Sequence, residues 1–162
     1  MKLIDILSAT PIPIGYRLAF LTNFMREPLL RRMEREYGLI RPEWTVLICL
    51  VFRDGLTSRD ICEVTEQPSN TISRAVSALL DKGMIRRQTD PRDGRRKLLY
   101  LESAGREQHD AVMAWFTEAE AHLTACLSAE ERDTLEALLD RMGRDVPRWQ
   151  QLPPYTAETE ND

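Results

Sequence analysis

Arginine and lysine gather in one short stretch of the chain, between Lys82 and Lys97. This stretch holds seven basic and two acidic residues, and the sequence Asp-Pro-Arg-Asp-Gly-Arg occupies positions 90–95 within it. A dense group of cations is suited to neutralising phosphate, and each guanidinium can also donate several hydrogen bonds to phosphate oxygens. The stretch therefore indicates a polyanion, above all nucleic acid, as its target.

The cations need a scaffold, and the sequence predicts a β-hairpin with strands at Ile85–Thr89 and Lys97–Leu101. The turn between the strands has suitable chemistry, because Pro91 presets φ, aspartate side chains hydrogen-bond locally, and Gly94 tolerates positive φ. A charged hairpin can also arise because edge strands must avoid aggregation. Seven basic residues exceed what edge protection requires, so we favour a binding role for the hairpin.

Two short helices joined by a tight turn are predicted immediately before the hairpin. Thr57, with Asp60 three residues later, has the pattern of an N-terminal capping box. Pro68 is suited to the first position of the second helix, which should end at Lys82-Gly83. The exposed face of that helix has a composition that suits base edges or phosphates, and equally an ordinary solvated surface. Its residues are Ser69, Asn70, Ser73, Arg74 and Ser77.

Charge is distributed unevenly along the 162 residues, although the net charge is only −4. Residues 69–97 hold eight basic and three acidic residues, whereas residues 102–162 hold five basic and fourteen acidic. A phosphate backbone would attract the first segment and repel the second. No apolar run approaches the ~20 residues that span a bilayer, so we expect a globular protein with no membrane partner.

The remaining chemistry-bearing residues point to no catalytic or metal site. His109 and His122 lack ligand spacing, so neither a metal nor another cofactor is expected. No nucleophile elbow, phosphate loop or metalloprotease motif occurs, so we do not expect an enzyme. Cys49, Cys62 and Cys126 do not form a disulfide framework, and the N-terminus does not resemble a signal peptide. These features predict a cytoplasmic protein.

Helices are also predicted before these two short helices. Residues 14–37 carry apolar side chains spaced by three or four, as in a long amphipathic helix. Pro28 is expected to kink or split this helix, and Gly38 to end it. Pro42 should begin another helix, which ends near Asp54.

Long helices are predicted after the hairpin as well. Ser103 should cap a helix over 104–127, and Ser128 should cap another, with Glu131 as its capping-box partner. The apolar stripes of these helices and of residues 14–37 need a covering partner. The sequence therefore predicts a helical dimer interface.

The helix-turn-helix at 57–85 and the wing at 86–106, with long flanking helices, resemble the MarR family of winged helix-turn-helix transcriptional regulators. The resemblance covers nearly the whole chain, and the DPRDGR wing tip is its most specific part. It implies a mainly α-helical fold with a small β-hairpin wing and long N- and C-terminal dimerisation helices. The expected parts of this one structural domain are an N-terminal dimerisation helix and arm (1–40), a DNA-binding lobe (41–101), C-terminal dimerisation helices (102–150) and a disordered tail (151–162).

The resemblance implies a repressor that acts as a homodimer and reads a pseudo-palindromic operator in double-stranded DNA. The start of the second helix of the motif, including Thr71, would lie in the major groove. Arg95 would reach the minor groove, and Asp90 would pair with Arg92 or Arg95 to hold the wing tip in shape. Phosphate contacts would come from Arg86, Arg87 and Arg96.

Many members of the family respond to a small phenolic or aromatic acid held between the dimerisation helices and the DNA-binding lobe. An arginine could pair with its carboxylate, and aromatic and apolar side chains could enclose its ring. The residues with this chemistry here are Tyr16, Arg17, Trp44, Met113 and Phe116. Packing in the core or dimer interface is the plainer interpretation of the aromatic residues.

The residues also leave an alternative function of a different class. The protein could be a winged-helix interaction module whose basic wing docks an acidic protein surface. We favour DNA because the basic segment coincides with a helix and a ribbon that both fit grooves. Salt separates the two functions, because phosphate neutralisation releases counterions and makes DNA affinity fall log-linearly with salt.

Overall fold

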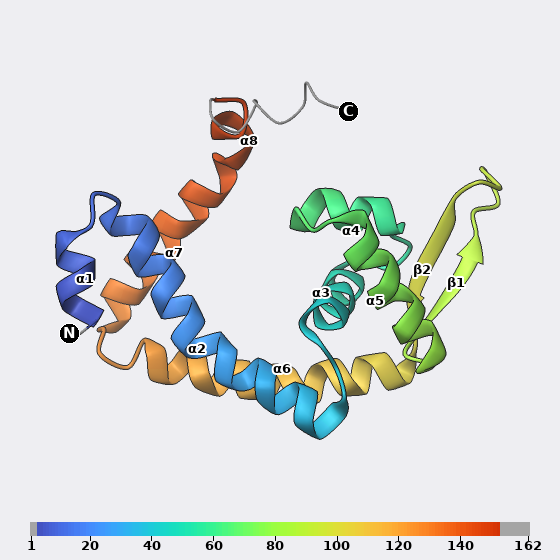
Figure 1. Cartoon of the computed structure of the whole chain (residues 1–162), viewed down its shortest axis with the longest axis horizontal. Helices are drawn as coiled ribbons and strands as arrows, with labels where there is room; N and C mark the ends of the chain where they lie inside the picture. The colour runs from blue at the N-terminus through green and yellow to red at the C-terminus, as the bar shows by residue number, and fades with distance from the viewer. Residues whose placement is uncertain (1–2, 153–162) are drawn as a thin grey trace. The chain divides into compact units, whose positions relative to one another are not determined.

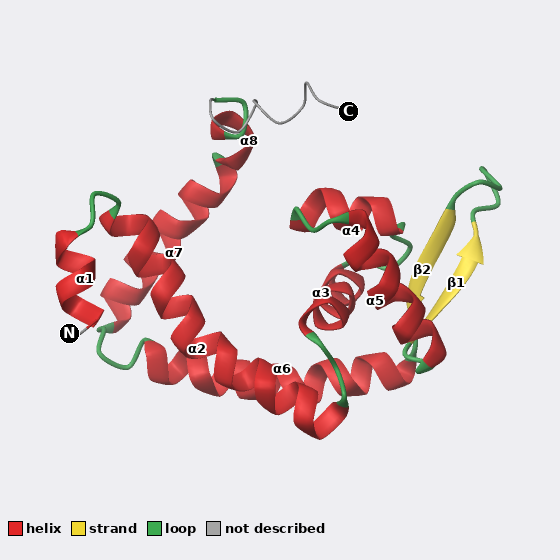
Figure 2. Cartoon of the chain, in the orientation of Figure 1, coloured by secondary structure: helices red, strands yellow, loops and turns green. Residues whose placement is uncertain are grey.

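The computed structural model describes residues 3–152, and the chain divides into two compact units, Met1–Glu120 and Ala121–Asp162. The predicted fold class is confirmed, because the structure is mainly helical with one two-stranded antiparallel sheet (Figures 1 and 2). None of the described helices is long and apolar enough to cross a membrane. The elements are α1 (Leu3–Ala9), α2 (Pro13–Tyr37), α3 (Arg41–Phe52), α4 (Ser58–Thr65), α5 (Ser69–Asp81), β1 (Ile85–Thr89), β2 (Lys97–Leu101), α6 (Ser103–Leu123), α7 (Ala129–Arg144) and α8 (Val146–Trp149).

Helix α2 is one continuous helix of 25 residues that includes Pro28, so of the two outcomes predicted, a kink or a split, the split is wrong. Proline removes one backbone donor, but the buried side chains of Leu30 and Met33 hold the following turns against the core. Gly38 ends the helix as predicted. Its φ is 62°, and its backbone N–H donates to the carbonyl of Glu34.

The helix-turn-helix consists of α4 and α5. The predicted capping box of α4 is confirmed, because Thr57 Oγ1 accepts from the Asp60 N–H at 3.2 Å and Asp60 Oδ2 accepts from the Thr57 N–H at 2.7 Å. Helix α5 begins at Ser69, so Pro68 is the N-cap and not the first helical residue. Glu66, with φ of 53°, turns the chain between the two helices.

The wing has the predicted strands, β1 and β2, in a register from Ile85 opposite Leu101 to Thr89 opposite Lys97. Leu56 adds an isolated bridge to Leu99 on the other side of β2. Two aspartates shape the tip between the strands. Asp90 accepts from the Arg92 backbone N–H at 2.8 Å, and Asp93 accepts from the Arg95 backbone N–H at 3.0 Å.

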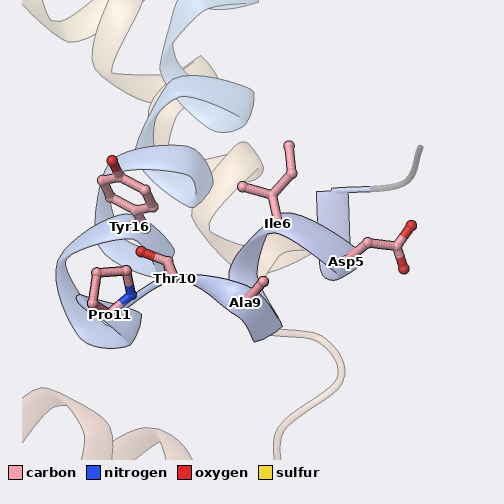
Figure 3. Close-up of a pocket in the computed structure, with 6 residues that line it drawn as sticks. All are labelled: Asp5, Ile6, Ala9, Thr10, Pro11 and Tyr16. Atoms are coloured by element: carbon pink, nitrogen blue, oxygen red, sulfur yellow. The ribbon is translucent and has the colours of Figure 1, made fainter.

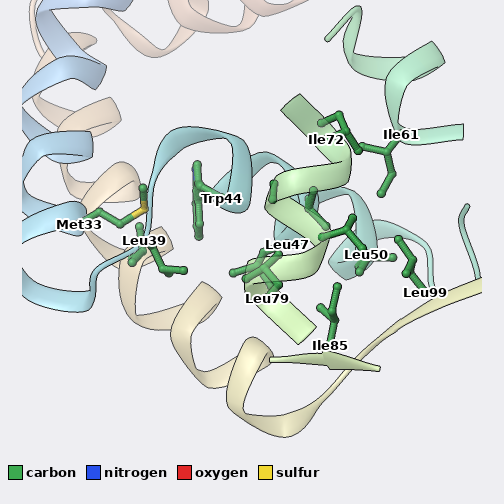
Figure 4. Packing of buried hydrophobic residues seen from close by; sticks show 14 of the residues in the cluster. Met33, Leu39, Trp44, Leu47, Leu50, Ile61, Ile72, Leu79, Ile85 and Leu99 are labelled. Carbon is green, nitrogen blue, oxygen red and sulfur yellow. The ribbon is translucent and has the colours of Figure 1, made fainter. Parts of the chain in front are cut away.

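A single hydrophobic core joins α2, α3, α4, α5, both strands and α6 (Figure 4). Gly105 lets the start of α6 lie against the chain before β1, because a side chain there would collide with the carbonyl of Met84 and with Leu101. The core therefore positions the helix-turn-helix and the wing together. Fully buried members include Met33, Leu39, Leu47, Leu50, Ile61, Ile72, Leu79, Leu99 and Val112.

The C-terminal elements differ partly from the sequence predictions. Helix α6 ends at Leu123 and not at residue 127, because Thr124–Cys126 form a turn. The cap of α7 is confirmed, since Ser128 Oγ accepts from the Glu131 N–H at 3.2 Å. Helices α1 and α8 were not predicted. The expectation of a disordered tail falls mostly on residues 153–162, which lie outside the described residues.

Candidate nucleic-acid interface

Helix α5 presents a continuous polar face to solvent. Its opposite face is buried through Ile72, Ala75, Val76 and Leu79, which fixes its orientation on the lobe. Thr71 lies at the margin, half-buried, and its N–H donates to the Asn70 side-chain oxygen at 2.8 Å. The five exposed residues of the face are those predicted from the sequence: Ser69, Asn70, Ser73, Arg74 and Ser77.

A groove of about 590 Å³ separates the start of α5 from α4. From α5 it is lined by Ser69, Asn70 and Ser73, and from α4 by Ser58, Arg59 and Cys62. The sequence prediction did not include the α4 residues. These residues lie in the first turns of α4, beside the start of α5, and this position could have identified them from the sequence.

The arginines of the lobe fall into two groups. Arg86 is occupied, because its guanidinium lies 3.1 Å from Glu102, 3.0 Å from the Gln88 side-chain oxygen and 4.4 Å from the centre of the Tyr100 ring. Four other arginines of α5 and the wing make no ion pair or side-chain hydrogen bond with any of residues 3–152. These unpaired arginines are Arg74, Arg87, Arg92 and Arg95. A guanidinium without a protein partner keeps all its donors available for phosphate.

The side chain that forms an ion pair with Asp90 is that of Arg96, at 3.8 Å, whereas Arg92 contacts Asp90 only through its backbone N–H. Arg96 also lies 3.9 Å from Asp60 and thus links the tip end of the wing to the start of α4. Hydrogen bonds from the Thr57 backbone and hydroxyl, with the nearby guanidinium, lower the pKa of Asp60. The aspartate is therefore charged at neutral pH and attracts Arg96.

A second cavity, of about 500 Å³, lies between the start of α4 and the wing. It brings Arg59 from α4 together with Arg95, Arg96 and Lys97 from the wing, and Asp60 is the one carboxylate in its lining. Cations from two elements therefore converge at the junction between helix-turn-helix and wing. Such a surface attracts an extended anion.

The residues predicted to hold an aromatic effector do not form one pocket within a single chain. The Trp44 ring stacks on His109 at 5.1 Å and on Phe116 at 5.7 Å, and Met113 packs beside the same core. Tyr16 lies 17 residues before Met33 on α2, which corresponds to about 25 Å of helix.

Tyr16 instead lines a separate cavity of about 460 Å³ at the junction of α1 and α2 (Figure 3). Its other lining residues are Asp5, Ile6, Ala9, Thr10 and Pro11. Arg17 donates to the carbonyl of Pro13 at 2.9 Å. The structure therefore separates Tyr16 and Arg17 from the aromatic residues around Trp44.

A helix-turn-helix with a short-chain polar face, followed by a hairpin with unpaired arginines, defines a winged helix-turn-helix protein. Residues 37–96 match the sequence model of the MarR family. This segment, which holds α3, the helix-turn-helix and most of the wing, is that of a MarR-family protein, and the family consists of transcriptional regulators.

Individual relatives agree with this assignment. The chain is 27% identical to the HTH-type transcriptional repressor Rv2887 of Mycobacterium tuberculosis over 140 residues, which are 85% of this chain and 98% of the relative. It is similar to MepR of S. aureus in a DNA complex (TM-score 0.69, 25% identity, 85% and 99% of the two chains). It is also similar to PcaV of Streptomyces coelicolor in complex with its natural ligand (TM-score 0.66, 26% identity, 90% and 99%).

Proposed function

We propose that this protein is a homodimeric repressor that binds a pseudo-palindromic operator through α5 and the wing, and that a small aromatic acid releases it. The observation that carries the proposal is the exposed polar face of α5 beside the unpaired arginines of the wing, on one lobe. Short polar side chains suit base edges in the major groove, and arginines suit phosphates and the minor groove.

Exposed apolar stripes support the homodimer. In the first unit, α2 exposes Ile14, Leu18, Leu21 and Phe24. In the second unit, α7 has no buried residue, although four apolar side chains follow helical spacing on it. They are Leu135, Leu138, Leu139 and Met142. An amphipathic helix gains most of its stability when a partner covers such a stripe, and a second copy of the chain supplies matching stripes.

Repression follows from occupancy of the operator, because a bound dimer excludes RNA polymerase from the same DNA. The similarity to Rv2887, which is named a repressor, supports this direction of control. The effector part of the proposal rests on the similarity to ligand-bound PcaV and on the aromatic residues around Trp44. Tyr16 and Arg17 would join these residues only if they came from the second subunit.

Selection from randomised duplex DNA tests the DNA-binding part. We expect enrichment of an inverted repeat whose half-sites lie about one helical turn, or 10 base pairs, apart. Affinity for the selected site should fall log-linearly with salt. Failure to enrich any sequence, together with binding to an acidic protein, would instead support the interaction-module function.

Competition with small molecules tests the effector part on the selected operator complex. We expect benzoate to release the DNA and to quench tryptophan fluorescence, because its ring and carboxylate match the proposed residues. Phenol tests whether the carboxylate is required. If neither compound changes the affinity for DNA, the aromatic effector is not part of the function.

A further inference from the structure

An ion pair between a partly exposed lysine and a buried carboxylate ties the end of the recognition helix α5 to the start of α3. Lys82, the C-cap of α5, places its ammonium nitrogen 2.7 Å from the Glu43 carboxylate. Glu43 is only 4% exposed, although its side chain ends in a carboxyl group. A buried carboxylate with a single charged partner depends strongly on that partner, so this contact is specific and not an incidental surface pair.

The same ion pair also reaches the end of α2. The Lys82 ammonium donates to the Gly38 carbonyl at 2.8 Å, and the same Glu43 oxygen accepts from the Ile40 backbone N–H at 3.0 Å. Gly38 ends α2, and Ile40 is the residue before α3. One lysine side chain therefore joins the ends of three helices, α2, α3 and α5.

The neighbouring residue, Trp44, extends the junction to a fourth helix. Its ring stacks on His109 and Phe116 of α6, with interplanar angles of 18° and 13°. Glu43 and Trp44 thus link the start of α3 to α5 and α2 on one side and to α6 on the other. Through these two residues, the orientation of the recognition helix depends on the helices that we expect to form the dimer.

We propose that Lys82 and Glu43 are positioning residues that set the separation of the two recognition helices, and so the half-site spacing that the dimer accepts. This inference rests on the proposed DNA-binding function. Neither side chain needs to touch DNA, because both act through the orientation of α5.

The length of α5 makes its direction sensitive to this junction. The helix places Ser69 about 20 Å from Lys82, at 1.5 Å per residue. A rotation of about 6° at the Lys82 end would move the Ser69 end by about 2 Å. In a symmetric dimer both helices move, and the combined change of about 4 Å is comparable to the ~3.4 Å that separates successive base pairs.

The test compares affinities for three duplexes: the selected operator and versions with one base pair inserted or deleted at its centre. Lys82→Met removes the ammonium, and the double variant Glu43→Gln/Lys82→Met also removes the buried charge that would otherwise be left unpaired. The double variant should fold, because removing both partners avoids the cost of an orphaned carboxylate. Lys82→Arg retains a cation that can reach Glu43.

We expect the wild-type protein to prefer the original spacing, and the double variant to lose about tenfold of that preference, a usual size for coupling between sites. Base preference within each half-site and the salt dependence of binding should not change. Lys82→Arg should restore the spacing preference. Lys97→Met is the matched control, because Lys97 lies on the wing, and its loss should weaken binding to all three duplexes equally.

Two results would overturn the inference. Equal loss of affinity at every spacing in the double variant would make Lys82 a phosphate contact or a residue of general stability. An unchanged spacing preference would show that the junction does not set the separation. If the wild-type protein enriches no operator, the proposed function fails and the inference fails with it, which the selection reveals before any variant is made.

Discussion

The recognition helix α5 and the wing belong to the same lobe but are built differently. Helix α5 is held by four buried side chains and presents short polar groups close to its backbone. The wing is held by the buried Ile85 and Leu99, and long arginine side chains extend from it. A short side chain on a firmly packed helix can discriminate between bases, whereas a long cation adapts to phosphate positions.

This contrast predicts a division of roles. Changes on α5 should alter which sequence is bound, and changes in the unpaired wing arginines should alter how tightly and how salt-dependently any sequence is bound. Arg86 and Arg96 already have carboxylate partners, so they should contribute less to DNA affinity than the unpaired arginines. The following variants test these roles.

Loss of the wing anchor should have the largest effect. Leu99→Ala removes a side chain that is 1% exposed and should lower the free energy of unfolding by about 2–5 kcal/mol. Leu98→Ala is the control, because Leu98 lies on the opposite, half-buried face of β2 and should cost much less. Urea unfolding of both variants measures the difference. Equal costs would show that the wing is not anchored through Leu99.

On α5, Asn70→Ala should change sequence preference. Loss of a bidentate hydrogen bond to a base should cost about 1–3 kcal/mol at one base pair of each half-site, with little change in the salt dependence of binding. Selection from randomised DNA with the variant measures this preference. If the variant selects the wild-type operator with equal stringency, Asn70 does not read a base.

In the wing, Arg95→Ala should lower affinity for all sequences by about tenfold. It should also reduce the slope of log affinity against log salt by about 0.9 for each phosphate that is no longer neutralised. Arg86→Ala provides the matched control, since Arg86 is occupied by Glu102 and Gln88. Its slope should stay closer to that of the wild type. A larger decrease of the slope in Arg86→Ala than in Arg95→Ala would contradict the distinction between paired and unpaired arginines.

The smallest effect concerns the cap that joins α4 to the wing. The pKa of Asp60 is lowered in the folded protein, so its contribution to stability is present above its unfolded pKa and is lost as pH falls through the lower, folded value. Thr57→Ala removes the hydroxyl of the cap and should cost about 1 kcal/mol at pH 7. Unfolding at pH 7 and at acidic pH should show a smaller acid-induced loss in Asp60→Asn than in the wild type. Equal losses would exclude Asp60 as a source of the pH dependence.

Local signals were sufficient to predict most of the helices and strands. The capping boxes at Thr57 and Ser128 and the turn residues at 90–95 act over a few residues, so the sequence alone predicts the elements that they bound. The predicted face of α5 likewise follows from helical spacing. Helix α1 was missed because only Leu7 of its seven residues is buried, which leaves a weak amphipathic pattern.

Contacts between distant residues could not be predicted in this way. The ion-pair partner of Asp90 was predicted to be Arg92 or Arg95, whereas the strand register places Arg96 beside Asp90 and the packing of α4 places it beside Asp60. Glu43 and Lys82 are 39 residues apart, and only the packing of α3 against α5 brings them together. The length of α2 likewise separates Tyr16 from Trp44 within one chain, which the sequence positions of these residues do not reveal.

Hydroxyl-radical footprinting of the selected operator is the sharpest test of how α5 and the wing bind DNA. We expect the wild-type protein to protect two segments about one helical turn apart, flanked by protected minor-groove sugars. Arg95→Ala should lose the flanking protection and keep the two central segments. Protection of a single segment, or flanking protection that persists in Arg95→Ala, would contradict the assignment of α5 and the wing to adjacent grooves.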